Sequence, residues 1–108
     1  MSYRKVTAII RRDVLEKVER ELQAIGVRGI SVTKVKGYGE YTDFYSRDGM
    51  VNHDRIEIFT TEPQADAIAQ SIMETAHVGL EGDGIVAVLP VEKLYRIRTR
   101  AEATVNEI

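Results

Sequence analysis

Glycines and an aspartate gather in one short stretch whose residue types could bind a phosphate group. Gly79, Gly82 and Gly84 lie within six residues, and Asp83 stands between the last two. Glycine lets the backbone adopt positive φ and approach a ligand closely. Successive backbone N–H groups in such a turn can form a concave site for anions. We call residues 78–84 the glycine turn, and it is a candidate phosphate site.

Two arginines follow the glycine turn at a spacing that suits the same chemistry. Arg96 comes twelve residues after Gly84, and Arg98 follows two residues later. Alternate residues of a strand point to one face, so both guanidinium groups could meet a single anion. The alternative is a tight turn followed by solvated basic residues. These residues alone do not decide between the two interpretations.

The composition argues against several other classes of function. A length of 108 residues suits one domain, residues 1–108, and a net charge of −2 does not favour general nucleic-acid binding. The absence of cysteine removes disulfides, thiolate nucleophiles and cysteine metal sites. No apolar stretch approaches the roughly 20 residues of a membrane-spanning helix, and the start does not read as a signal peptide. We therefore expect a cytoplasmic protein without direct membrane insertion.

Apolar patterning predicts four strands and two helices. The strands are expected at residues 5–11, 30–38, 54–61 and 85–89, the last buried on both faces and ended by Pro90. Helical spacing of apolar residues follows Asp13 and Thr61, each of which is expected to cap its helix. Beyond Pro90 we expect a short helical connector at residues 91–95, a small edge strand at 95–99 and a frayed tail at 100–108.

The order of these elements is βαββαβ with a short extra C-terminal strand. This is the pattern of a ferredoxin-like α+β fold, a four-stranded antiparallel sheet with two helices on one face. The other face is left bare, and we expect its Ile and Val side chains to be covered by self-association. The polar residues 40–53 predict a mobile loop. Its aromatic residues indicate either a partner contact or packing back onto the domain.

Four stretches of the chain resemble the PII signal-transduction family. They are VTAIIR near the start, GVRGISVTKVKGYG, RIEIF and GLEGDGIVAVLPVEKLYRIRT, of which the last is the most specific. The resemblance implies a compact homotrimer that holds adenine nucleotides between neighbouring subunits. Residues 40–53 would be the T-loop of the family, residues 78–84 its B-loop and residues 95–108 its C-terminal segment.

Position by position, the resemblance implies a nucleotide site shared by two subunits. Backbone groups of Gly82, Asp83 and Gly84 would hold the phosphates, and Arg96 and Arg98 would clamp them from the neighbouring subunit. The residues implied around adenine and ribose are Ile9, Gly29, Ser31, Gly37, Tyr38, Gly39, Glu57, Ile58 and Phe59.

The chain departs from the family pattern at three positions that bear on the ligand. Tyr41 replaces a glutamine that helps to hold magnesium and 2-oxoglutarate, and His53 replaces the lysine that pairs with a 2-oxoglutarate carboxylate. Ile85 replaces a lysine that contacts phosphate, and an apolar side chain cannot neutralise a terminal phosphate. The T-loop is also shorter than usual. These departures favour ADP or AMP over ATP, argue against 2-oxoglutarate and suggest a divergent PII-like branch.

Two classes of function stay open. The first is an adenine-nucleotide sensor whose T-loop contacts a membrane transporter or a metabolic enzyme. The second is a trimeric regulator that responds to bicarbonate or a metal, linked to inorganic-carbon transport or heavy-metal efflux. Tyr41 and His53 are candidate effector residues. Asp43, Asp48 and Asp54 could add donors, but their spacing fits no fixed metal motif, and no spacing predicts an enzyme.

We expect 2-oxoglutarate to give no heat of binding in calorimetric titration, even when Mg-ATP is present. The physical reason is the loss of both the glutamine and the lysine that hold this dicarboxylate in the family. A saturable signal from 2-oxoglutarate would reverse the prediction.

Overall fold

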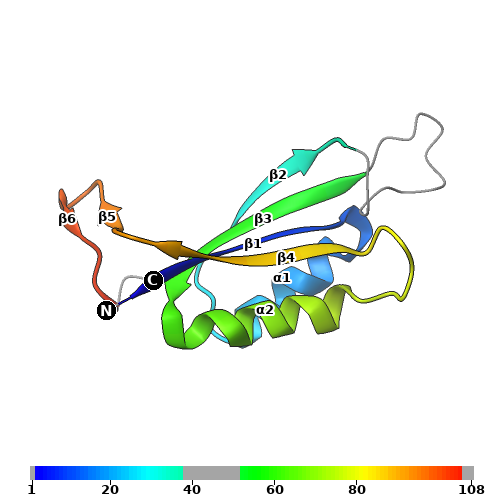
Figure 1. Ribbon diagram of the computed structural model, residues 1–108, viewed down its shortest axis with the longest axis horizontal. Helices are drawn as coiled ribbons and strands as arrows, with labels where there is room; N and C mark the ends of the chain where they lie inside the picture. The colour runs from blue at the N-terminus through cyan, green and yellow to red at the C-terminus, as the bar shows by residue number, and fades with distance from the viewer. Residues whose placement is uncertain (1, 38–51, 106–108) are drawn as a thin grey trace.

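Figure 1 shows the computed structural model of the protein, which describes residues 2–37 and 52–105. In these ranges the chain forms, in order, β1 (Tyr3–Arg11), the 3-10 turn η1 (Arg12–Val14), α1 (Leu15–Ala24), β2 (Ser31–Val35), β3 (His53–Thr61), α2 (Glu62–Ala76), β4 (Gly84–Val91), β5 (Tyr95–Arg96) and β6 (Ala101–Glu102). The predicted βαββαβ order is confirmed. Most of the predicted T-loop lies outside the described residues.

The main sheet is antiparallel, with the strand order β2-β3-β1-β4. Both helices cover the same face, as Figure 1 shows, so the predicted ferredoxin-like α+β fold is confirmed. In the central strand β1, burial alternates: Val6, Ala8 and Ile10 are at most 1% exposed, whereas their neighbours are only half-buried. This period of two places one side of β1 in the core.

The hydrophobic core lies between the sheet and the two helices. Side chains from β1, η1, α1, β3 and α2 form one cluster of buried residues: Val6, Ala8, Ile10, Val14, Val18, Leu22, Ile56, Ile58, Ala65, Ile68, Ile72 and Ala76. Burial of this apolar surface is the main stabilising contribution to such a fold.

β4 differs from its prediction because it lies at an edge of the sheet. Ile85 is 46% exposed and Leu89 is 41% exposed, so the strand is not buried on both faces. It has a neighbouring strand, β1, on one side only, and neither helix covers the bare face. Pro90 does not end β4, which continues to Val91. Proline is tolerated there because the outer side of an edge strand needs no N–H donor.

Residues 92–105 form a hairpin in place of the helical connector predicted at 91–95 and the frayed tail predicted from residue 100, and the edge strand predicted at 95–99 is present only as β5. β5 pairs with β6, and the N–H of Arg100 donates to the carbonyl of Arg96 at 2.8 Å. The Tyr3 hydroxyl donates to the carbonyl of Ala103 at 2.6 Å, which ties the end of the hairpin to the start of β1. We call residues 94–103 the C-terminal arm. Local patterning missed it because its anchor lies 100 residues away.

The predicted helix caps are also wrong in detail. Asp13 lies inside η1, and α1 begins at Leu15 without a side-chain hydrogen bond to its first turn. Thr61 does occupy the N-cap position of α2, but its side chain makes no capping bond. The helices are thus held mainly by packing of their apolar faces.

The bare face of the sheet is more polar than expected. Glu57 pairs with Lys5 of the neighbouring strand β1 at 3.1 Å and with Arg55 of its own strand at 3.2 Å. Ile9 and Ile85 stand opposite one another on the same face. The face therefore combines a charged network with exposed apolar side chains.

We predict that any side chain at position 84 destabilises the fold. The φ of Gly84 is +111°, and a Cβ added there would lie 1.8 Å from the carbonyl oxygen of Ile9. We expect Gly84→Ala to lower the free energy of unfolding by about 3 kcal/mol or more, because backbone must shift. Gly29→Ala is the matched control, since a Cβ there meets nothing within 4 Å. Equal stabilities of the two variants in urea unfolding would contradict this account.

Candidate functional site

The glycine turn is shaped by its three glycines and by the carboxylate of Asp83. Gly79, Gly82 and Gly84 all have positive φ, at 88°, 90° and 111°, as expected from their type. Asp83 Oδ2 accepts hydrogen bonds from the N–H of Val78 at 3.0 Å and of Gly79 at 2.9 Å. The Asp83 side chain thus folds back onto its own turn and holds the backbone in one shape.

Arg11 and His53 attach this turn to the sheet. The Nε of Arg11 lies 3.4 Å from Asp83 Oδ1, and its guanidinium also donates to the carbonyl of Glu81. His53 is 1% exposed, and its Nε2 lies 2.6 Å from the carbonyl oxygen of Gly82. Because a carbonyl can only accept, Nε2 carries the proton in this bond. His53 therefore supports the turn, and its effector role stays a prediction.

Electrostatics keep Asp83 ionised. Partial burial would raise the pKa of Asp83, but the bonds from the Gly79 and Val78 N–H groups and from the Arg11 guanidinium outweigh it and hold the pKa below its ordinary value of 3.8. Sequence reasoning missed Arg11. Its position at the end of an apolar strand was visible, but its partner lies 72 residues away.

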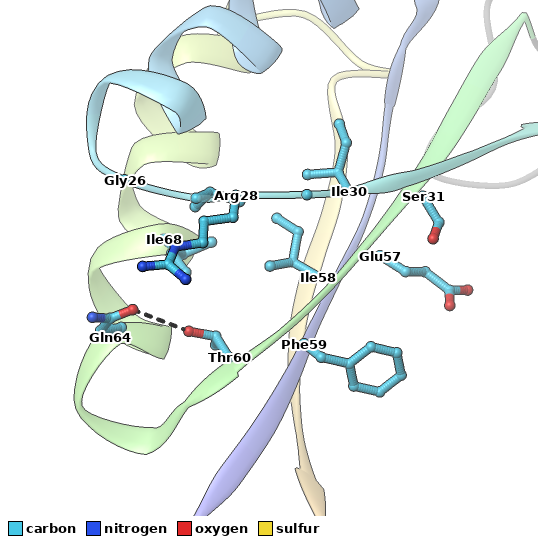
Figure 2. Close-up of a pocket in the computed structure, with 12 residues that line it drawn as sticks. Gly26, Arg28, Ile30, Ser31, Glu57, Ile58, Phe59, Thr60, Gln64 and Ile68 are labelled. Carbon is cyan, nitrogen blue, oxygen red and sulfur yellow. Dashed lines mark hydrogen bonds between the residues drawn. The ribbon is translucent and has the colours of Figure 1, made fainter. Parts of the chain in front are cut away.

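A cavity of about 440 Å³ lies beside the last residues of β3, which have no neighbouring strand on this side, and between the start of β2 and α2 (Figure 2). It exists because β2 pairs with β3 only from Ser31↔Glu57 to Val35↔His53, so β3 has no partner on this side beyond Glu57. Five residues predicted around adenine and ribose line it: Gly29, Ser31, Glu57, Ile58 and Phe59. The structure therefore brings these residues together from two separate segments.

Sequence reasoning missed the other lining residues of this cavity. Three that matter here come from the connection before β2 and from the β3–α2 corner: Arg28, Thr60 and Gln64. Figure 2 shows Thr60 and Gln64 side by side on the helix side of the sheet. No motif marks them, because they meet only where β3 turns into α2.

The remaining predicted residues near the glycine turn are only partly described. Ile9 pairs with Ile85 in the sheet, and its carbonyl contacts Gly84. Gly37 follows β2 and is half-buried. The predicted residues outside the described ranges are Tyr38, Gly39 and Tyr41.

Arg96 and Arg98 do not share a strand face as predicted. β5 ends at Arg96, and Arg98 lies in the turn that leads to β6. The two arginines still belong to one short hairpin, in which Arg98 is exposed and Arg96 is half-buried. The C-terminal arm can therefore present both to a ligand, but not through strand alternation.

The glycine turn and the C-terminal arm lie at opposite ends of the chain's main sheet, as Figure 1 shows. The turn leads into β4 and the arm follows it. At about 3.3 Å per residue, the eight residues of β4 separate them by about 26 Å. The glycine turn and the C-terminal arm of a single chain therefore cannot both contact one phosphate group.

Residues 2–37 and 52–105 hold no group of three or more His, Asp or Glu side chains placed to bind one metal ion. Asp54, a candidate donor, instead accepts from Arg12 Nε at 3.2 Å, whereas Asp43 and Asp48 lie outside these ranges. Within the same part of the chain no helix is long and apolar enough to cross a bilayer.

Comparisons with known proteins agree on one family. A family model described as Nitrogen regulatory protein P-II matches residues 3–101. A Pasteurella multocida protein named Nitrogen regulatory protein P-II is 38% identical over 106 residues, covering 92% of this chain and 95% of that protein. An Azospirillum brasilense protein of the same name is 34% identical over 103 residues, covering 89% and 92%.

A solved structure extends this similarity to three dimensions. The crystal structure of Arabidopsis thaliana PII bound to citrate matches this fold with a TM-score of 0.81 and 34% sequence identity. The match covers 94% of this chain and 89% of that one.

Loss of the Asp83 carboxylate should weaken the fold in a pH-dependent way. Because the pKa of Asp83 is lowered on folding, its contribution is present at neutral pH and is lost as the pH falls through the folded pKa, below 3.8. We expect Asp83→Asn to lower the free energy of unfolding at pH 7 by about 1–2 kcal/mol and to flatten the acid limb of the stability curve. Asp66→Asn, at an exposed site on α2, is the control, and identical acid limbs for Asp83→Asn and Asp66→Asn would refute the assignment.

Proposed function

The chain belongs to the nitrogen regulatory protein P-II family, whose members are signalling regulators, and from this premise we propose that it binds ADP or AMP between copies of itself. Bound nucleotide then sets the conformation of the T-loop, residues 40–53, which contacts a membrane transporter or a metabolic enzyme. The whole chain acts as one PII-like domain in the cytoplasm, assembled as a homotrimer and without a nucleic-acid partner.

The observation that carries this proposal is that the predicted site residues of one chain are divided between the two ends of its main sheet. The cavity with Gly29, Ser31 and Phe59 lies near the carboxyl end of β3, and the arm that bears Arg98 leaves from the same end of the sheet. The glycine turn lies at the other end. A second copy, placed with its glycine turn against this cavity and arm, would complete a site for base, sugar and phosphate together.

Exposed apolar surface supports association of copies. Ile97 is 93% exposed at the tip of the arm, and Ile85 and Leu89 are more than 40% exposed along the edge strand. The radius of gyration, 14.9 Å, exceeds the value of about 13 Å expected for a lone domain of this length. Contact between copies would bury these side chains and the projecting arm.

The glycine turn is mechanically connected to the T-loop. His53, the last residue of the predicted T-loop, bonds to the carbonyl of Gly82, and Arg11 links Asp83 to the end of β1. A phosphate group bound at the turn would therefore act on residues that fix one end of the loop. Nucleotides with different phosphate numbers would favour different loop conformers, which is a population shift.

The preference for ADP or AMP follows from the side chain after the turn. Ile85 comes directly after Gly84 and offers no charge to a terminal phosphate. The positive charges proposed to reach the phosphates are those of the neighbouring arm. ATP would carry one more phosphate than this arrangement neutralises.

A second candidate function, regulation by a small anion such as bicarbonate, rests on a different cavity. About 360 Å³ of space lies at the base of the T-loop, lined by Arg11, Arg12, Asp13, Asn52 and His53. Two arginines there suit an anion, although both already pair with carboxylates of Asp83 and Asp54. Calorimetric titration with bicarbonate, divalent metals and the three adenine nucleotides separates the two functions.

Removal of one arm arginine should weaken nucleotide binding. We expect Arg98→Ala to reduce the affinity for ADP by about 1.5–3 kcal/mol, tenfold or more, because a hydrogen bond to a charged group is lost. Arg20→Ala, an exposed position on α1, serves as the control. Calorimetry checks both, and an unchanged affinity in Arg98→Ala would contradict the proposed phosphate role.

A mixing experiment tests whether the site is shared. Arg98→Ala chains keep the turn, and Asp83→Ala chains keep the arm, so neither variant alone has an intact site. Co-refolding the two at equal concentration should restore ADP binding at about a quarter of the sites if each site takes its turn and arm from different chains. No recovery on mixing would show that turn and arm are not complementary parts of one site.

A further inference from the structure

The loop of the C-terminal arm holds an arginine in a backbone conformation that arginine rarely adopts. Arg96 pairs with Ala101, so residues 97–100 connect β5 to β6. Arg100 is the last of them, and its φ of +57° makes it the one non-glycine residue with positive φ in the described part of the chain. Glycine or asparagine suits this region, whereas the Cβ of other residues crowds the following carbonyl oxygen. Such an outlier indicates a function for the side chain.

Hydrogen bonds keep this loop in one shape. The N–H of Arg100 donates to the carbonyl of Arg96 at 2.8 Å, which closes a five-residue turn. At the base of the hairpin, the N–H of Ala103 donates to the carbonyl of Leu94 at 2.8 Å. The pairing of β5 with β6 therefore holds Arg100 in the left-handed conformation and brings it next to Arg96.

The same turn concentrates positive charge. Arg96, Arg98 and Arg100 alternate along five residues, and the last two are exposed. Among the ion pairs of the described residues, none involves Arg98 or Arg100. Like charges this close repel one another. An anion bound among the three guanidinium groups would relieve that repulsion and use the conformation in which Arg100 is held.

We propose that Arg100 is a third phosphate-binding residue of the arm and that it selects a nucleoside diphosphate over a monophosphate. This inference rests on the proposed function, since it assumes a nucleotide between copies. A monophosphate carries about two negative charges at neutral pH, and a diphosphate carries about one more. The guanidinium groups of Arg96 and Arg98 balance the first, and that of Arg100 balances the additional charge. Of ADP and AMP, ADP is therefore the ligand that this chain binds more tightly.

The opposite wall of the proposed site offers the second phosphate little positive charge. Ile85 follows Gly84 directly and is apolar. Asp83 is an anion whose carboxylate is bound to the N–H groups of its own turn. Arg11 already lies 3.4 Å from Asp83 as its ion-pair partner. The charge that balances the second phosphate therefore comes from the neighbouring arm.

Calorimetric titration of the full-length protein with ADP and with AMP tests this assignment. Arg100→Gly removes the guanidinium and suits positive φ, so we expect it to bind ADP about tenfold or more weakly while its AMP affinity changes less than twofold. Arg100→Asn also tolerates this backbone and should give the same result. Arg100→Lys keeps a charge without the planar fork and should recover part of the ADP affinity.

Lys93→Ala is the matched control, because it removes an exposed cation just before the arm. Without ligand, Arg100→Gly should melt at the wild-type temperature or above it, since glycine relieves the backbone. Arg100→Gly and Arg100→Asn with the ADP affinity of Lys93→Ala, or with equal losses for ADP and AMP, would overturn the inference. A wild-type protein that binds neither nucleotide would instead refute the proposed function, so the two failures are distinguishable.

Discussion

The antiparallel pairing of β1 with both β3 and β4 is the constraint on which the rest of the structure depends. Its register places Ile10 opposite Gly84 and Arg11 opposite His53 at one end of the sheet. At the other end it places Tyr3 opposite Val91, just before the C-terminal arm. One strand therefore positions both the glycine turn and the arm, and it keeps them apart by the length of the sheet.

The elements of the candidate site lie outside the hydrophobic core. The helices bury one face of the sheet to form the core. The glycine turn, the unpaired end of β3 and the C-terminal arm all lie outside it. Each is held by a few polar contacts: Asp83 within the turn, Thr60 with Gln64 at the unpaired end of β3, and Tyr3 with Ala103 at the arm. Elements held this way can respond to a ligand without unfolding the domain.

Much of the fold was predictable because it follows from short-range periodicity. The alternation in β1 and the apolar stripes of the two helices are local patterns, and they led to the correct element order and sheet. The errors came from long-range context. β4 has an apolar sequence typical of a central strand, but it lies at an edge. The tail at residues 100–108 is predicted to fray, because the bond that Ala103 accepts comes from Tyr3, 100 residues away.

The sequence by itself determined the residue types of the candidate site: the three glycines that adopt positive φ and the two arginines of the C-terminal arm. It also determined the family, because the family model matches residues 3–101 of the sequence. Only the tertiary structure decided which of them meet. It grouped five predicted residues around one cavity with Thr60 and Gln64, and made His53 a buried support of the turn, because strand pairing brings together residues that no spacing in the chain relates.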